Sequence, residues 1–179
     1  MNKEFAARRL DVKSFAEEGA ALSGEATVEH HPRLVAETQG RGSQSPVSWS
    51  ARGELRNPQH VLPEIWLHLE AQSTLSLTCQ RCLSPVDVPL TVQRSFRFVP
   101  DEDMAAAQDE QSEEDVLAAS RSFDLVELVE DELLMEVPLA PRHETCPLVK
   151  LGLADAGFDS PSARQENPFA LLGKLKTGK

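Results

Sequence analysis

The chain has 179 residues, of which 40% are hydrophobic and only 5% aromatic, and its formal net charge is −11 at pH 7. Three cysteines are too few for a disulfide framework, and the sequence shows neither a signal-peptide pattern nor an uncharged apolar run long enough to span a bilayer. We therefore expect a soluble cytoplasmic protein with a single domain over residues 1–179, whose core covers about 10–148.

Two short elements are expected near the N-terminus. The stretch DVKSFAEEG (11–19) predicts a helix, because Asp11 can cap its first turn and a glycine closes it. Residues 22–28 alternate between the two faces of an extended chain, which is typical of a strand. His30 and His31 stand beside a proline, and we expect both to be surface residues in a turn.

Four further stretches alternate apolar and polar residues with a period of two. This period predicts antiparallel strands that bury one face and expose the other. The last stretch is the longest, and it keeps the alternation from Val86 to Phe98 with one interruption at Arg94. The four stretches are VSWSARGEL (47–55), PEIWLHLEA (63–71), TLSLTC (74–79) and PVDVPLTVQRSFRF (85–98).

Negative charge is concentrated in one part of the chain. Residues 101–136 contain 14 Asp and Glu against one basic residue, Arg121. Residues 101–120 have little periodic apolar content, so we expect a mobile acidic loop there. The next stretch, DLVELVEDELLMEV, has apolar residues at helical spacing, with Asp124 as its cap and Pro138 as its stop. It predicts a long amphipathic helix that covers one face of the sheet.

The C-terminal tail, residues 150–179, is loop-rich until the stretch ENPFALLGKLK, which predicts a short helix with Phe169 and Leu172 on its apolar side. The predicted fold class is therefore α+β. It consists of an antiparallel β-sheet or partly open barrel covered by one long amphipathic helix, with an acidic mobile loop and a loop-rich tail that ends in a short helix.

The motif CQRC places Cys79 and Cys82 beside a hairpin turn. A thioredoxin-like redox pair needs its first cysteine at a helix N-terminus, whereas this pair follows a strand. A structural zinc site needs two further ligands, which RHETC supplies as His143 and Cys146 in a Cys3His set. The alternative is that Cys79 is a small core residue and the others are ordinary loop residues. The zinc hypothesis fails if Cys82 and Cys146 lie far apart in the fold.

Several segments, taken in order, resemble one family. They are CQRCLSP before an alternating strand, DLVELVEDELLMEVPLAPRHETC, and the closing NPFALLGKLK. Over about residues 10–176 the chain resembles the YceD family of large ribosomal RNA subunit accumulation proteins. The resemblance implies a role in the synthesis, processing or stability of 23S ribosomal RNA. It implies no reaction and no catalytic residues.

Charge and composition indicate how such a role is performed. A protein of charge −11 without tyrosine is a poor platform for single-stranded RNA. We expect a basic ribosomal protein or a large-subunit precursor as the partner, with indirect or edge contact to 23S rRNA through Arg81, Arg94, Arg97 and the terminal lysines. The alternatives are an acidic segment that is merely solvated and a closing helix that packs on its own domain. The candidate partner-binding residues are Asp109, Glu110, Glu113, Glu114, Asp115, Phe169 and Leu172.

Enzymatic machinery is not apparent in the sequence. There is no Gly-rich phosphate loop, and no Ser/His/Asp or Cys/His arrangement for nucleophilic catalysis presents itself. The favoured function is a non-enzymatic ribosome biogenesis factor with no membrane and no small-molecule substrate. The alternative is a metal-dependent RNA-processing enzyme that uses the Cys/His set. Metal content and an RNA cleavage assay with and without chelator distinguish the two.

Overall fold

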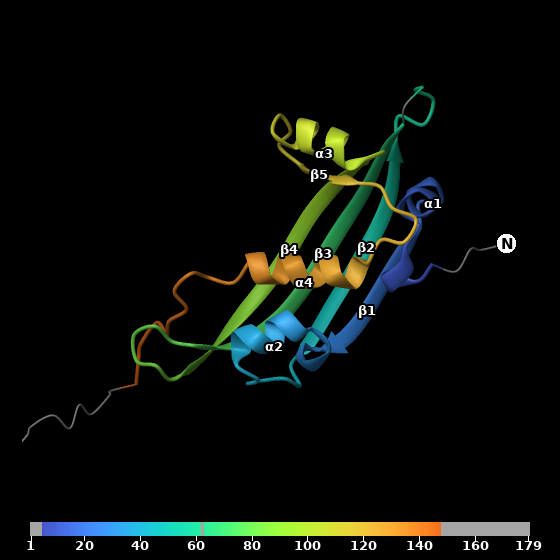
Figure 1. Ribbon diagram of the computed structural model, residues 1–179. Helices are drawn as coiled ribbons and strands as arrows, with labels where there is room; N and C mark the ends of the chain where they lie inside the picture. The colour runs from blue at the N-terminus through green and yellow to red at the C-terminus, as the bar shows by residue number, and fades with distance from the viewer. Residues whose placement is uncertain (1–4, 62, 148–179) are drawn as a thin grey trace, which may run out of the picture. The chain divides into compact units, whose positions relative to one another are not determined.

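A five-stranded sheet forms the centre of the computed structural model, which describes residues 5–61 and 63–147 (Figure 1). The strands lie side by side in the order of the chain. The first four are antiparallel to their neighbours, and the last pairs with its neighbour in parallel. The strands are β1 (Ala21–Thr27), β2 (Pro46–Arg56), β3 (Glu64–Thr78), β4 (Pro85–Val99) and β5 (Asp115–Ala118).

The long strands β3 and β4 follow from the period-two pattern of their sequences. Leu67, Leu69 and Leu75 of β3 have no exposed surface, while the even-numbered residues between them, such as Glu70, face the opposite side. In the β3–β4 register Leu67 stands opposite Phe96, so apolar side chains from both strands share one face. Two of the predicted strands, 63–71 and 74–79, form the single strand β3, because no residue between them breaks the alternation.

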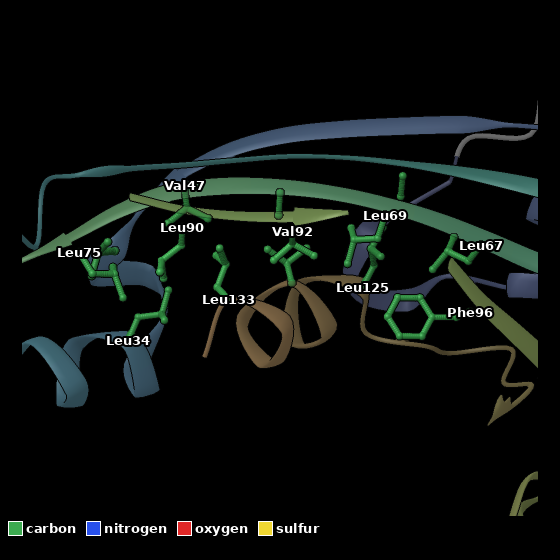
Figure 2. Close-up of a cluster of buried hydrophobic side chains, with 14 of the residues drawn as sticks. Leu34, Val47, Leu67, Leu69, Leu75, Leu90, Val92, Phe96, Leu125 and Leu133 are labelled. Carbon is green, nitrogen blue, oxygen red and sulfur yellow. The ribbon is translucent and has the colours of Figure 1, made fainter. Parts of the chain in front are cut away.

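The helix α4 (Leu125–Met135) crosses the apolar face of the sheet. The side chain of Asp124 caps it by accepting hydrogen bonds from the backbone N–H groups of residues 126 and 127, as predicted. Leu125 and Leu133 have no exposed surface and point toward β3 and β4, where they meet Val92 and its neighbours (Figure 2). The amphipathic pattern therefore identified the buried side of this helix.

Two shorter helices, α1 (Val12–Glu17) and α2 (Pro32–Thr38), complete the main core, together with two short 3-10 segments, Ala7–Arg9 and Val28–His30. The backbone of α1 packs directly against β2 at Gly53, where an added Cβ atom would lie 2.7 Å from the carbonyl oxygen of Phe15. Only glycine permits this close approach.

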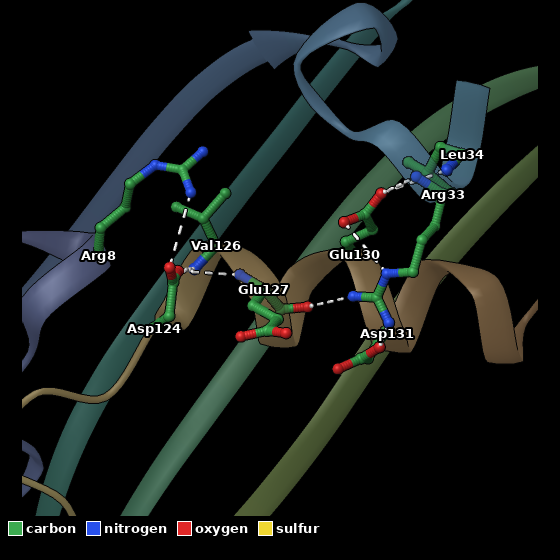
Figure 3. A network of polar contacts seen from close by, with 8 residues as sticks. All are labelled: Arg8, Arg33, Leu34, Asp124, Val126, Glu127, Glu130 and Asp131. Atoms are coloured by element: carbon green, nitrogen blue, oxygen red, sulfur yellow. Dashed lines mark hydrogen bonds and ion pairs between the residues drawn. The ribbon is translucent and has the colours of Figure 1, made fainter. Parts of the chain in front are cut away.

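Polar contacts connect α2 to α4 (Figure 3). Glu130 is buried, and its Oε1 accepts hydrogen bonds from the backbone N–H groups of Arg33 at 2.7 Å and Leu34 at 3.2 Å. The guanidinium of Arg33 also pairs with Glu130 and Asp131. His31, directly before α2, is only 1% exposed, so the prediction of a surface histidine is wrong at this position. His31 is the residue at which the short helix α2 begins, and the sequence analysis did not identify this helix.

The acidic stretch 101–120 differs from the predicted loop, because it contains the helix α3 (Glu102–Asp109) and the strand β5. Asp101 caps α3 by accepting from the N–H of residue 104, and Asp109 accepts from the N–H of Val116 at 3.0 Å. A small apolar cluster of Val99, Ala105 and Val116 stabilises the arrangement. Few apolar residues are needed here, which is why hydrophobic periodicity did not reveal these elements.

The α+β class is confirmed, with an open sheet and several helices in place of a partly open barrel and one long helix. Contacts along the chain delimit a unit over Met1–Cys146. The predicted tail helix, with Phe169 and Leu172, lies outside the described residues, so the single domain over 1–179 stays a prediction. Within the described ranges no helix has the length and apolar character needed to cross a membrane.

Candidate metal centre

The turn between β3 and β4 has a fixed backbone geometry. The N–H of Leu83 donates to the carbonyl oxygen of Cys79 at 2.9 Å, and the N–H of Cys79 donates to that of Ser84 at 3.0 Å. Leu83 has a φ of 61°, which lies in the left-handed region. These features turn the chain tightly enough to place the side chains of Cys79 and Cys82 on the same side.

The segment after α4 is held against this turn by main-chain contacts. The N–H of Gln80 donates to the carbonyl oxygen of Pro141 at 2.8 Å, and the guanidinium of Arg81 donates to that of His143 at 3.3 Å. These contacts bring His143 and Cys146 to the hairpin although they are more than 60 positions away in sequence. The predicted proximity of the two pairs is confirmed.

The four side chains form a compact set of possible ligands. The sulfurs of Cys79, Cys82 and Cys146 and one ring nitrogen of His143 all lie within 4.8 Å of one another. The Sγ atoms of Cys79 and Cys146 are 3.7 Å apart, and Nδ1 of His143 is 3.4 Å from Sγ of Cys82 and 4.0 Å from Sγ of Cys146. A tetrahedral zinc ion, with bonds of about 2.3 Å to sulfur and about 2.0 Å to nitrogen, requires separations of about 3.8 Å between sulfurs and about 3.5 Å between sulfur and nitrogen. The geometry therefore fits a tetrahedral metal ion.

The orientation of His143 also suits ligation. Its Nε2 lies 2.9 Å from the carbonyl oxygen of Pro85, which can only accept a hydrogen bond. This contact assigns the proton to Nε2 and leaves the lone pair of Nδ1 directed at the sulfurs. A ligating histidine commonly has such a second partner, which fixes its tautomer and ring orientation.

The electrostatics of the cluster favour thiolates at the two cysteines of the turn. Burial raises the pKa of the Cys79 thiol, but the backbone N–H groups of Cys82, Arg81 and His143 outweigh it and lower the pKa to about 5. Burial raises the pKa of the Cys146 thiol to about 11. The contact with the thiol of Cys79 raises the pKa of His143. The backbone of Ser84 lowers the pKa of the Cys82 thiol as well, so the two cysteines of the turn become anionic ligands more readily than Cys146.

The donor set can bind a metal, and its composition is that of a structural site. Four protein donors close a tetrahedral coordination sphere, whereas catalytic zinc sites keep one position for water or substrate. Cys79 has no exposed surface, and the other three side chains are partly buried. The predicted identity of the metal stays a prediction.

The acidic candidate residues lie at the other end of the sheet, where β5 pairs with the Phe96–Val99 end of β4. Glu110, Glu113 and Glu114 are in the connection between α3 and β5, and all three are exposed. The five candidates in this stretch, Asp109, Glu110, Glu113, Glu114 and Asp115, thus come together on one small subdomain. Whether they bind a partner stays a prediction.

Arg94 is engaged by this acidic region. Its guanidinium lies 3.9 Å from Asp115, 3.6 Å from Glu132 and 4.0 Å from Glu136. Burial raises the pKa of Glu132, an effect that the positive charge of Arg94 opposes. Three carboxylates therefore compete with RNA phosphates for Arg94. This residue is a poor candidate for the expected edge contact with RNA.

A further polar arrangement was not identified from the sequence. On the solvent face of the sheet, Nδ1 of His68 lies 2.8 Å from Oγ of Ser95, and Nε2 of His68 lies 2.6 Å from a carboxylate oxygen of Glu54. The alternation of the strands indicated the shared face, but only the register puts His68 opposite Ser95. Because the group lies on an open sheet face, we interpret it as a cross-strand polar row that stabilises the sheet.

Comparison with known proteins identifies the family. The model of the family "Large ribosomal RNA subunit accumulation protein YceD" matches residues 67–176, which include the metal-ligand candidates and the acidic region. The chain is 31% identical over 109 residues to the large ribosomal RNA subunit accumulation protein YceD of Haemophilus influenzae. The match covers 60% of this chain, and the chain spans 63% of the length of that relative. No solved structure matches. The chain belongs to the YceD family.

Proposed function

We propose that this protein is a non-enzymatic ribosome biogenesis factor that supports the synthesis, processing or stability of 23S rRNA in the cytoplasm. The observation that carries the proposal is membership of a family described by large ribosomal RNA subunit accumulation. The family description names no reaction. The closed donor set at the candidate metal centre supports the same view, because it leaves no open ligand position for catalysis.

The proposed partner is a basic ribosomal protein or a large-subunit precursor that presents one. Residues 101–136 carry 14 acidic residues and one basic residue, and most of them lie on α3, β5 and α4. The electrostatic field of clustered charges of one sign attracts oppositely charged proteins and speeds their association. Ribosomal proteins that bind RNA need basic surfaces, so they match this charge.

The acidic surface is defined as Asp109, Glu110, Glu113, Glu114 and Asp115. Two of these residues have internal roles, since Asp109 accepts a backbone hydrogen bond and Asp115 lies near Arg94. The other three are available for a partner without loss of a fold contact, except that Glu114 also accepts from Ser112 at 3.1 Å. They are the residues to change in a test.

Zinc is the metal that we propose for the Cys3His set. Thiolate-rich sets of four donors favour zinc over magnesium or calcium, which prefer oxygen ligands. Cys79, Cys82, His143 and Cys146 would hold it, and the bound ion would cross-link the β3–β4 hairpin to the segment that follows α4. Its contribution would be to stability and to the shape of this end of the sheet.

The partner is tested with a charge-neutralised variant, Glu110→Gln/Glu113→Gln/Glu114→Gln. Its affinity for purified basic large-subunit ribosomal proteins is measured by fluorescence anisotropy. A matched control neutralises three exposed acids elsewhere, Glu18→Gln/Glu25→Gln/Glu37→Gln. We expect a loss of about tenfold or more in the first variant and a much smaller one in the control, because removal of a rim charge typically acts on association. Equal affinities for wild type and both variants would refute the acidic surface as the docking site.

A further inference from the structure

Three arginines gather around the candidate metal centre. The guanidinium of Arg41 donates to Oγ1 of Thr78 at 2.6 Å, which places it beside the end of β3. Arg81 lies in the turn itself and donates to the carbonyl oxygen of His143. Arg142 precedes that histidine in sequence and is exposed. We call Arg41, Arg81 and Arg142 the arginine cluster.

The arginine cluster differs from the arginines near α4 in its charge partners. Arg33 and Arg94 each pair with two or more carboxylates. Within the described part of the chain, no member of the arginine cluster lies within ion-pair distance of an Asp or Glu. Hydrogen bonds to neutral oxygens position Arg41 and Arg81 without cancelling their charge. An anion that reaches this end of the sheet therefore meets three guanidinium groups that are not engaged by a carboxylate of the described residues within ion-pair distance.

The acidic surface is too far away to cancel this charge. In β3, Trp66 lies near the end where β5 pairs, and Thr78 lies at the hairpin, 12 residues further along the strand. At about 3.3 Å per residue this separation is about 40 Å. The Debye length at physiological ionic strength is about 8 Å, so the two ends are electrostatically independent. A net charge of −11 therefore does not exclude binding of a polyanion at the hairpin end.

An apolar side chain accompanies the arginine cluster. Leu83 is 75% exposed, and its left-handed backbone fixes it in the turn, two residues after Arg81. A ligand that suits this surface offers phosphates to the arginines and a flat apolar face to the leucine. Single-stranded nucleic acid has both, because its bases are not hidden in a duplex.

We propose that the metal-centre end of the sheet, through the arginine cluster and Leu83, binds the phosphate backbone of single-stranded RNA. This inference rests on the proposed function, which supplies RNA as the polyanion at hand and a metal ion that would hold the turn. It adds a second contact surface, at the opposite end of the sheet from the acidic surface. The protein would thereby bridge a basic protein and an unpaired stretch of RNA.

The test measures the affinity of the metal-loaded full chain for a fluorescently labelled single-stranded RNA oligonucleotide as a function of salt. Each phosphate neutralised on a single strand contributes a slope of about −0.7 in log K against log salt. Three arginines predict a slope of about −2, or about a 20-fold loss of affinity between 50 and 200 mM salt. Arg41→Gln should reduce this loss to about 7-fold, and the triple variant Arg41→Gln/Arg81→Gln/Arg142→Gln should abolish binding.

A matched control changes three exposed arginines away from this end, Arg9→Gln/Arg52→Gln/Arg121→Gln, and should keep the wild-type slope. Arg41 lies outside both ligand segments, so the single variant Arg41→Gln remains informative even if the triple variant loses its metal. An unchanged slope for Arg41→Gln would overturn the proposal. If RNA binding fails while the basic ribosomal proteins still bind the acidic surface, only this inference falls.

Discussion

If the Cys3His set binds zinc as proposed, removal of the ion should destabilise the chain by an amount that the positions of the ligands determine. A bound ion would join Cys82 to His143, which are 61 positions apart. If this cross-link restricts the unfolded chain as a disulfide does, a loop of that length corresponds to about 4 kcal/mol. For a unit of this size, 1 kcal/mol shifts the melting temperature by about 3–4 °C, so we expect a fall of about 10–15 °C.

The assay is thermal unfolding of the reduced protein, loaded with zinc and then treated with a chelator, with metal content measured before and after. Cys82→Ser should melt at the temperature of the chelated wild type and show no further response to chelator. Gln80→Ala, an exposed change in the same turn, should respond as the wild type does. A wild-type protein that takes up no zinc and melts at one temperature with and without chelator would refute the cross-link.

Three further changes test buried side chains at α2 and α4. Leu133→Ala should cost about 2–5 kcal/mol in urea unfolding, because this side chain is fully buried between α4 and the sheet; a cost below about 1 kcal/mol would contradict the packing of α4. Glu130→Gln should cost about 1–3 kcal/mol, since the carboxylate caps α2 and pairs with Arg33, whereas the exposed control Glu127→Gln should be nearly neutral. Burial lowers the pKa of His31 in the folded chain. Below about pH 6.5 the His31 side chain is therefore protonated in the unfolded chain, while the folded chain disfavours its protonation. Stability should therefore fall as the pH drops through that value, and His31→Leu should remove this part of the pH dependence; an unchanged pH profile would show that His31 is not buried neutral.

Much of the sheet was predictable, because the alternation of apolar and polar residues that indicates a strand is a local property of the sequence. The alternation through β3 and β4 identified the buried face, and Asp124 marked the start of α4. By contrast, α3 and β5 depend on a few contacts, such as the hydrogen bond from Val116 to Asp109, that leave almost no apolar periodicity. A strongly acidic composition therefore favoured a loop where a small subdomain forms.

The candidate metal centre was predictable for a different reason. The residue types and the equal spacing of the two pairs indicated a Cys3His set, and a helix that packs back on the sheet could bring them together. The orientation of His143 could not be deduced, because it depends on the carbonyl oxygen of Pro85 in another strand. The row of Glu54, His68 and Ser95 was missed in the same way, since the register that joins it is a tertiary property.

The central claim is that the protein acts on the large ribosomal subunit through its acidic surface. The most direct measurement is sedimentation of the protein through a sucrose gradient from cells in which 23S rRNA precursors accumulate. We expect the wild type to co-sediment with a large-subunit precursor and the variant Glu110→Gln/Glu113→Gln/Glu114→Gln to remain near the top of the gradient. A wild type that stays at the top, or a variant that sediments with the precursor as the wild type does, would contradict the claim.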